Sequence, residues 1–130
     1  MAGSPSPPLG SDRPRILLVE DEYLIAAMVC DMLVDLGCEY IGPIANMEQG
    51  IAAAKSVACE AAIINLVIEG RHAYEIVEAL AVRDIPFCFA SGLPQHEIIE
   101  KWRDRPFMMK PYVLDDVRAF LVKIALLHTD

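Results

Sequence analysis

Five short apolar runs alternate along this chain with five segments whose apolar residues recur at helical spacing. This alternation constrains the fold more than any other feature of the sequence. Short continuous apolar runs are typical of strands that are buried on both faces of a parallel sheet. The predicted strands cover 16–19, 40–44, 61–64, 86–90 and 107–109, and the predicted helices cover 24–36, 47–57, 72–82, 94–101 and 115–127.

Strands that alternate with helices in this way predict an α/β fold, with helices packed on both faces of the sheet. We expect a flavodoxin-like (βα)5 three-layer sandwich with strand order 2-1-3-4-5. Residues 1–14 are rich in Pro and Ser and indicate a flexible leader, so the predicted domain covers residues 15–130.

Polar residues follow the predicted strands at the point where each strand ends. Glu20 and Asp21 follow the first strand, Asn65 closes the third, Ser91 follows the fourth, and Lys110 follows the fifth. In an open α/β sheet, the ligand site lies at the carboxyl ends of the strands, near the point where the strand order reverses. The sequence therefore predicts one site built from these five residues.

Each of these residues has a definite chemical use at such a site. The adjacent carboxylates Glu20 and Asp21 are hard oxygen ligands suited to Mg²⁺, and the backbone carbonyl of Val67 could add a third. Ser91 offers a hydroxyl group, and Lys110 offers a cation for a carboxylate or a phosphoryl oxygen.

The motifs around these residues resemble those of the response-regulator receiver domain of two-component signalling. Residues 19–22 (Val-Glu-Asp-Glu) are similar to the acidic motif after the first receiver strand, and residues 65–70 (Asn-Leu-Val-Ile-Glu-Gly) to the family's Asp-Val-Asn-Leu-x-Gly. Residues 89–92 (Phe-Ala-Ser-Gly) resemble the Phe-Ala-Thr-Gly of a group of stand-alone receivers. Residues 110–112 (Lys-Pro-Tyr) match the Lys-Pro-Phe/Tyr motif, in which the Lys-Pro bond is usually cis.

The resemblance implies a phosphoryl-accepting aspartate at the position of Asn65. It also implies a Mg²⁺ ion held by the acidic pair, contacts from Ser91 and Lys110 to the phosphoryl oxygens, and a signalling switch formed by Ser91 and Phe107. A carboxamide is a poor nucleophile and cannot form an acyl phosphate. It also removes a negative charge, so we expect Mg²⁺ binding to be weak.

Three interpretations of Asn65 stay open at this point: a natural pseudo-receiver regulated by binding, an ordinary receiver with an engineered Asp-to-Asn change, and a decayed site in which only the fold matters. In each case we expect the Asn65 amide to donate a hydrogen bond to Asp21 or accept one from Lys110.

Other classes of protein fit the sequence less well. A flavin or nucleotide enzyme on this fold would need a glycine-rich phosphate loop after the first strand, where this chain has the acidic residues 20–22. The formal net charge of −8 argues against binding nucleic acid. No apolar run is long enough to cross a membrane, and the first residues lack the pattern of a signal peptide, so we expect neither a membrane span nor a signal peptide. Cysteines 30, 38, 59 and 88 occur singly, as expected for buried residues rather than for a metal site.

We therefore predict a non-enzymatic, cytoplasmic signalling module that acts through protein contacts. The expected partners are a histidine kinase or phosphotransfer protein, an effector, or both. Apolar residues outside the main stripe of the last helix, such as Leu114 and Val122, predict either a homodimer or a partner contact at the surface of the fourth and fifth helices. Trp102 either caps the edge of the core or anchors a partner.

Overall fold

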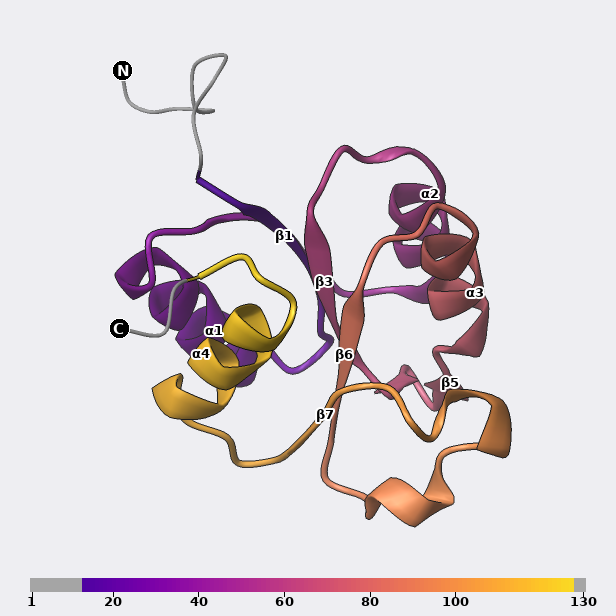
Figure 1. The fold of residues 1–130 in the computed structure, drawn as a ribbon. Coiled ribbons are helices and arrows are strands. Elements are labelled where there is room, and N and C mark those ends of the chain that lie inside the picture. Colours follow the sequence, from indigo (N-terminus) through magenta and orange to yellow (C-terminus); the bar gives the residue numbers. More distant parts are fainter. Residues whose placement is uncertain (1–12, 128–130) are drawn as a thin grey trace.

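The computed structural model describes residues 13–127, which form an α/β fold around a five-stranded parallel sheet of order β2-β1-β3-β6-β7. The strands are β1 (Arg15–Val19), β2 (Glu39–Ile44), β3 (Ala61–Asn65), β6 (Phe87–Ser91) and β7 (Phe107–Met109). Counted in chain order, this is the predicted order 2-1-3-4-5, so the predicted flavodoxin-like topology is confirmed. Figure 1 shows the helices on the two sides of this sheet.

Two apolar cores lie on opposite faces of the sheet, because alternate residues of each strand point to opposite faces. Leu17 and Ile64 belong to the core under α2 (Met47–Ser56) and α3 (Tyr74–Val82). Ile16 and Ile63 belong to the core under α1 (Tyr23–Asp35) and α4 (Leu114–Lys123). β1, β3 and β6 are almost entirely buried, which explains their unbroken apolar sequence.

Helix α1 buries only some of its apolar residues. Its buried residues are Ala26, Val29, Cys30 and Leu33, whereas Leu24 is 74 % exposed and Met28 is 51 % exposed. The helix is apolar on most sides, so its periodicity does not select one face. Several large apolar side chains of α1 therefore remain on the surface.

The predicted helix at 94–101 is wrong. The connection between β6 and β7 holds two short 3₁₀-helices instead, Gln95–Glu97 and Glu100–Trp102. Only Ile98 and Trp102 of this connection are buried, so the segment packs too little apolar surface against the core to stabilise an α-helix. The described residues thus contain four α-helices. The last of them, α4, ends at Lys123 rather than at the predicted residue 127, and Ala125 has a φ of 67°.

Trp102 packs into the core from this connection. It is 3 % exposed, and its ring lies edge-on to Phe87 with centroids 5.6 Å apart. The Arg105 guanidinium lies over both rings, 5.0 Å from each centroid. This packing supports the core interpretation of Trp102 over the partner anchor.

A two-residue hairpin follows β3 and was not predicted. Strands β4 (Val67–Ile68) and β5 (Arg71–His72) pair antiparallel, and the loop residues Glu69 and Gly70 both have positive φ, 52° and 81°. Positive φ at both positions is typical of the turns that close tight hairpins.

Two residues that precede the predicted domain boundary also contact the sheet. The backbone carbonyl of Pro14 accepts a hydrogen bond from the Glu39 N–H at 2.8 Å, and Arg13 pairs with the same glutamate at 3.6 Å. The remainder of the predicted leader, residues 1–12, lies outside the described residues. No helix within residues 13–127 is long and apolar enough to cross a membrane.

Candidate functional site

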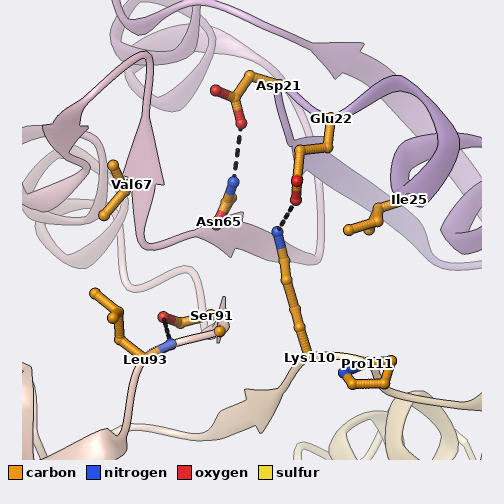
Figure 2. A pocket seen from close by; sticks show the side chains of 10 residues that line it. Asp21, Glu22, Ile25, Asn65, Val67, Ser91, Leu93, Lys110 and Pro111 are labelled. Atoms are coloured by element: carbon orange, nitrogen blue, oxygen red, sulfur yellow. Dashed lines mark hydrogen bonds and ion pairs between the residues drawn. The ribbon is translucent and has the colours of Figure 1, made fainter.

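An open cleft lies at the carboxyl ends of β1, β3, β6 and β7, where the sequence predicts the site. It is lined by Asp21, Glu22, Ile25, Asn65, Val67, Ser91, Gly92, Leu93, Lys110 and Pro111 (Figure 2). The parallel strands bring these residues together, since their carboxyl ends all meet at this edge of the sheet. The Lys110–Pro111 peptide bond is cis.

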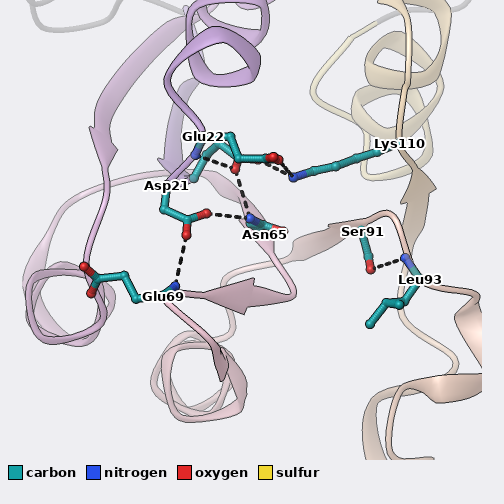
Figure 3. A network of polar contacts seen from close by, with 8 residues as sticks. Asp21, Glu22, Asn65, Glu69, Ser91, Leu93 and Lys110 are labelled. Carbon is teal, nitrogen blue, oxygen red and sulfur yellow. Dashed lines mark hydrogen bonds and ion pairs between the residues drawn. The ribbon is translucent and has the colours of Figure 1, made fainter.

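Asn65 joins the two carboxylates of the acidic pair. Its side-chain amide nitrogen, Nδ2, donates to Glu20 Oε2 at 2.9 Å. It also donates to Asp21 Oδ1 at 3.0 Å, and Figure 3 shows these two side chains facing one another. The residue is buried, with 7 % of its surface exposed. The expected bond to Asp21 is present, and the bond to Glu20 is additional. Both hydrogens of the amide are thus used to bridge two acids.

The second oxygen of Asp21 is bonded to the β4–β5 hairpin. Asp21 Oδ2 accepts a hydrogen bond from the Glu69 N–H at 3.0 Å. The positive φ of Glu69 belongs to the hairpin loop, so the tight turn places this N–H beside the acidic pair. Each carboxylate oxygen of Asp21 therefore receives a donor from the segment 65–69.

Lys110 neutralises the other side of the acidic group. Its ammonium, Nζ, lies 3.0 Å from Glu20 Oε1 and 2.9 Å from Glu22 Oε1. The Lys110 side chain is 12 % exposed and that of Glu20 only 1 %, whereas Glu22 is 59 % exposed. The cation thus contacts two acids, and the alternative expectation, that it donates to Asn65, is not what this structure shows.

Glu20 is the most deeply buried charge of the group. Burial raises its carboxyl pKa, because taking a carboxylate out of water disfavours the charged form. The Glu22 N–H, which donates to Glu20 Oε2 at 3.0 Å, and the Lys110 ammonium lower the pKa in part. The net shift of the Glu20 pKa is upward, so these hydrogen-bond donors do not fully replace the lost water.

Ser91 and Phe107 stand apart from this network. The hydroxyl oxygen of Ser91 accepts from the Leu93 N–H at 2.8 Å, and the residue lines the same cleft. Phe107 is half-buried and packs against the core under α2 and α3, outside the cleft lining. The switch roles of both residues stay predictions.

The few oxygen ligands at this site fit a hard cation such as Mg²⁺. Ala73 N–H donates to the Leu66 carbonyl at 2.8 Å, so Val67 and His72 form the pair that exchanges no backbone hydrogen bonds. The hairpin thereby leaves the Val67 carbonyl outside its own ladder. With Glu20 and Asp21 it could supply oxygen ligands, but a cation would compete with Asn65 and Lys110 for the carboxylates.

Within residues 13–127, no group of three or more His, Cys, Asp or Glu side chains is placed to hold a metal ion. The four cysteines are free; Cys59 is half-buried and the other three are buried. The predicted burial is confirmed for Cys30, Cys38 and Cys88 and is only partial for Cys59.

Sequence reasoning missed two contributors to the network. The side chain of Glu22 pairs with Lys110, and the only available signal was its place in the acidic run 20–22. Glu69 acts through its backbone N–H, which no side-chain pattern reveals. The Glu-Gly pair at 69–70 was the one hint, because it favours a tight turn.

Comparison with known proteins identifies the family. No family model matches the chain. The solution structure of SdrG from Sphingomonas melonis Fr1 is 36 % identical and has a TM-score of 0.78, over 88 % of this chain and 98 % of that one. A BeF3-activated conformation of SdrG, from Pseudomonas melonis Fr1, is 35 % identical with a TM-score of 0.70, over 87 % and 96 % of the two chains.

The receiver domain of the sensor histidine kinase PA1611 from Pseudomonas aeruginosa shares the fold at 18 % identity. Its TM-score is 0.69 over 86 % of this chain and 98 % of that one, and it holds a magnesium ion in its active site cleft. The transcriptional regulatory protein PdtaR of Mycobacterium tuberculosis is 23 % identical over 107 residues, 79 % of this chain and 52 % of that protein. The chain thus spans about half the length of the curated relatives it matches.

The fold and the SdrG likeness together define a signalling module of the two-component class. The chain belongs to the response-regulator receiver family, whose domains are typically non-catalytic signalling modules.

Proposed function

We propose that this receiver signals without being phosphorylated at the usual position, because Asn65 occupies that position. It is a cytoplasmic interaction module rather than an enzyme, and a histidine kinase or phosphotransfer protein, an effector, or both are its partners. The observation that carries the proposal is the pair of hydrogen bonds from Asn65 Nδ2 to Glu20 and Asp21. The amide nitrogen donates to the acids and offers no nucleophile to a phosphoryl group.

The surrounding network supports the same proposal. Lys110 forms ion pairs with Glu20 and Glu22, and the Glu69 N–H donates a hydrogen bond to Asp21, so each carboxylate has a hydrogen-bond donor without a bound ion. A phosphoryl group bound here would lie near three carboxylates and one ammonium group that is already ion-paired. This charge balance disfavours an anion.

Mg²⁺ binding is expected to be weak. Glu20, Asp21 and the Val67 carbonyl would hold the ion, which supplies charge neutralisation for a phosphoryl group when it is bound. Because Asn65 lacks the charge of an aspartate, the unmodified site should favour Mg²⁺ less than its Asn65→Asp variant does.

The decisive experiment compares the unmodified chain with Asn65→Asp. Each is incubated with Mg²⁺ and acetyl phosphate, and the intact mass is measured; BeF3⁻ replaces the phosphodonor in a parallel NMR titration. We expect no mass increase for the unmodified chain. If the mass of the unmodified chain increases, peptide mapping locates the phosphate, and a phosphate at the cleft residues would contradict the proposal.

An ordinary receiver that carries an Asp-to-Asn change is the second candidate. The intact remainder of the site favours it, since Ser91 and Lys110 both line the cleft and the Val67 carbonyl is free of the hairpin ladder. A phosphate gained only by Asn65→Asp would support this candidate. If neither form is modified, the site as a whole has diverged and binding alone remains.

The exposed apolar surface supports signalling through protein contacts. Tyr23 and Leu24 of α1 are 83 % and 74 % exposed, and Val113, next to α4, is 60 % exposed. Large apolar side chains left on a surface can contribute to interfaces. The predicted homodimer through the surface of the fourth and fifth helices, which the sequence places at 94–101 and 115–127, is part of the proposal. Sedimentation that shows only monomer at high concentration would contradict it.

A further inference from the structure

A bulge in β2 lies beside the strand that leads into the acidic pair. β1 and β2 pair in register from Arg15 to Leu17, which lies opposite Ile41, and the next pair is Val19 with Ile44. One residue of β1 therefore faces two residues of β2, Gly42 and Pro43. A bulge of this kind bends a strand and redirects the residues that come after it.

Only glycine fits at position 42. Its φ is 109°, which L side chains rarely adopt, and a Cβ built there would lie 2.7 Å from the Ile44 nitrogen and 2.7 Å from the Leu18 oxygen. Both of these atoms are backbone, so neither can move aside without shifting a strand. The position is on the surface, so burial does not explain the need for glycine.

The bulge determines which residue of β2 lies beside the backbone of Glu20. After it, the Ile44 carbonyl accepts a hydrogen bond from the Glu20 N–H at 2.9 Å, which extends the pairing of β2 beyond Val19, the last residue of β1. The Glu20 side chain then meets Asn65 at 2.9 Å and Lys110 at 3.0 Å. The backbone of Glu20 is thus fixed from a strand that contributes no side chain to the cleft.

We propose that Gly42 is a positioning residue for the acidic pair, acting through the Ile44 carbonyl on Glu20. Its value to signalling rests on the proposed function, whereas its effect on geometry does not. A side chain at this position moves Ile44 away from Glu20 and loosens the contacts between Glu20 and Asn65.

The test compares Gly42→Ala with Gly50→Ala by native-state amide hydrogen exchange and NMR. Gly50 is the control, because a Cβ there would meet the flexible end of Ile76 at 2.7 Å and would make only an ordinary van der Waals contact, 3.4 Å, with the Val19 side chain of β1. For Gly42→Ala we expect the protection of the Glu20 amide to fall at least about tenfold relative to Ile63. The side-chain NH₂ signals of Asn65 should also move. Gly50→Ala should change neither, even if it unfolds more easily.

An unchanged Glu20 amide and unchanged Asn65 signals in Gly42→Ala would overturn the proposal. If that variant does not fold, the unmodified chain decides: the Glu20 amide should be protected like that of Val19, and rapid exchange would overturn the proposal.

A Mg²⁺ titration followed by NMR separates this proposal from the proposed function. Adding Gly42→Ala to Asn65→Asp should weaken Mg²⁺ binding severalfold, and equal binding by the two variants would overturn the positioning role. If Asn65→Asp itself takes up no Mg²⁺, the site proposal fails, whereas the exchange data on the otherwise unmodified chain still decide the role of Gly42.

Discussion

An acid–base pair lies at each end of the central sheet, and the two pairs differ in what surrounds them. At the amino end, Arg15 and Glu60 form a forked pair, with Arg15 Nη2 2.6 Å and Nε 3.2 Å from the carboxylate oxygens. Both side chains are more than a third exposed there. At the carboxyl end, Lys110 and Glu20 are 12 % and 1 % exposed.

The two glutamates respond in opposite directions. The side-chain hydrogen bond from Arg15 lowers the pKa of Glu60, whereas burial raises the pKa of Glu20 although Lys110 is in contact. A cation at hydrogen-bonding distance therefore does not by itself fix the charge state of an acid; the loss of water can outweigh it. The pair at the amino end contributes to the stability of the fold. At the carboxyl end, the pKa of Glu20 is shifted in a way that is common at functional sites.

Removal of each cation should give the largest contrast between the two ends. Lys110→Met leaves Glu20 buried without its counter-charge and should lower the free energy of unfolding by about 3 kcal/mol, measured by urea denaturation at pH 7. Arg15→Met breaks a solvent-screened pair and should cost about 1 kcal/mol. Equal losses would show that burial does not distinguish the two pairs.

Asn65→Asp should break the carboxyl-end network alone. It replaces a donor with a third carboxylate beside Glu20 and Asp21, and should cost about 2 kcal/mol of unfolding free energy in a chelator. Saturating Mg²⁺, at about 100 times its dissociation constant, should return about 2.7 kcal/mol. Arg15→Met serves as the control, because Mg²⁺ should not change its loss of unfolding free energy. If Mg²⁺ also leaves the loss in Asn65→Asp unchanged, the assignment of the metal ligands is contradicted.

The pH dependence sharpens the comparison further. Because the folded-state pKa of Glu60 is lowered, its stabilisation is present above the unfolded pKa and is lost as the pH falls through the folded value. Glu60→Gln should therefore cost about 1 kcal/mol at pH 7 and little below the lowered folded-state pKa.

Glu20 has the opposite sign. Its raised pKa means that the cost of burying its charge is absent at low pH and appears as the pH rises through the folded value. The free energy of unfolding of Glu20→Gln, relative to that of the parent protein, should therefore be higher at pH 7 than at pH 4 in the same denaturation series. A parallel pH trend for the two glutamine variants would contradict the opposite pKa shifts.

The smallest effect is expected beneath the carboxyl end, at Tyr112. Its hydroxyl is buried without a hydrogen-bond partner among the described residues, and burial raises its pKa. Since an unpaired buried hydroxyl contributes nothing favourable, Tyr112→Phe should change the unfolding free energy by less than about 0.5 kcal/mol. A larger loss would reveal a contact of the hydroxyl that this conformation does not contain.

The arrangement of the sheet could be predicted because each strand is an apolar run, such as residues 16–19, that ends in a polar residue. The same reasoning brought Asp21, Asn65, Ser91 and Lys110 to one edge, since parallel strands align their carboxyl ends. The features that could not be predicted depend on three-dimensional packing. An amide can donate or accept, and only the positions of its neighbours show that Asn65 donates to both acids.

The errors have similar physical causes. Residues 94–101 contain too few buried apolar residues to stabilise an α-helix over local turns. Within this connection, only Ile98 and Trp102 are buried in the core. Strands of two residues, such as β4, are too short to show a period. On α1, where apolar residues lie on most sides, spacing cannot choose between Leu24 and Ala26 as the buried residue.

The packing of Trp102 has a practical consequence. It is the one tryptophan in the sequence, so fluorescence excited selectively from tryptophan arises from the connection between β6 and β7. With its indole edge-on to Phe87 and covered by Arg105, a shift in emission would report movement of that connection without any label. A partner or ion that binds at the carboxyl end could thus be tested optically for long-range effects, independently of any change in mass.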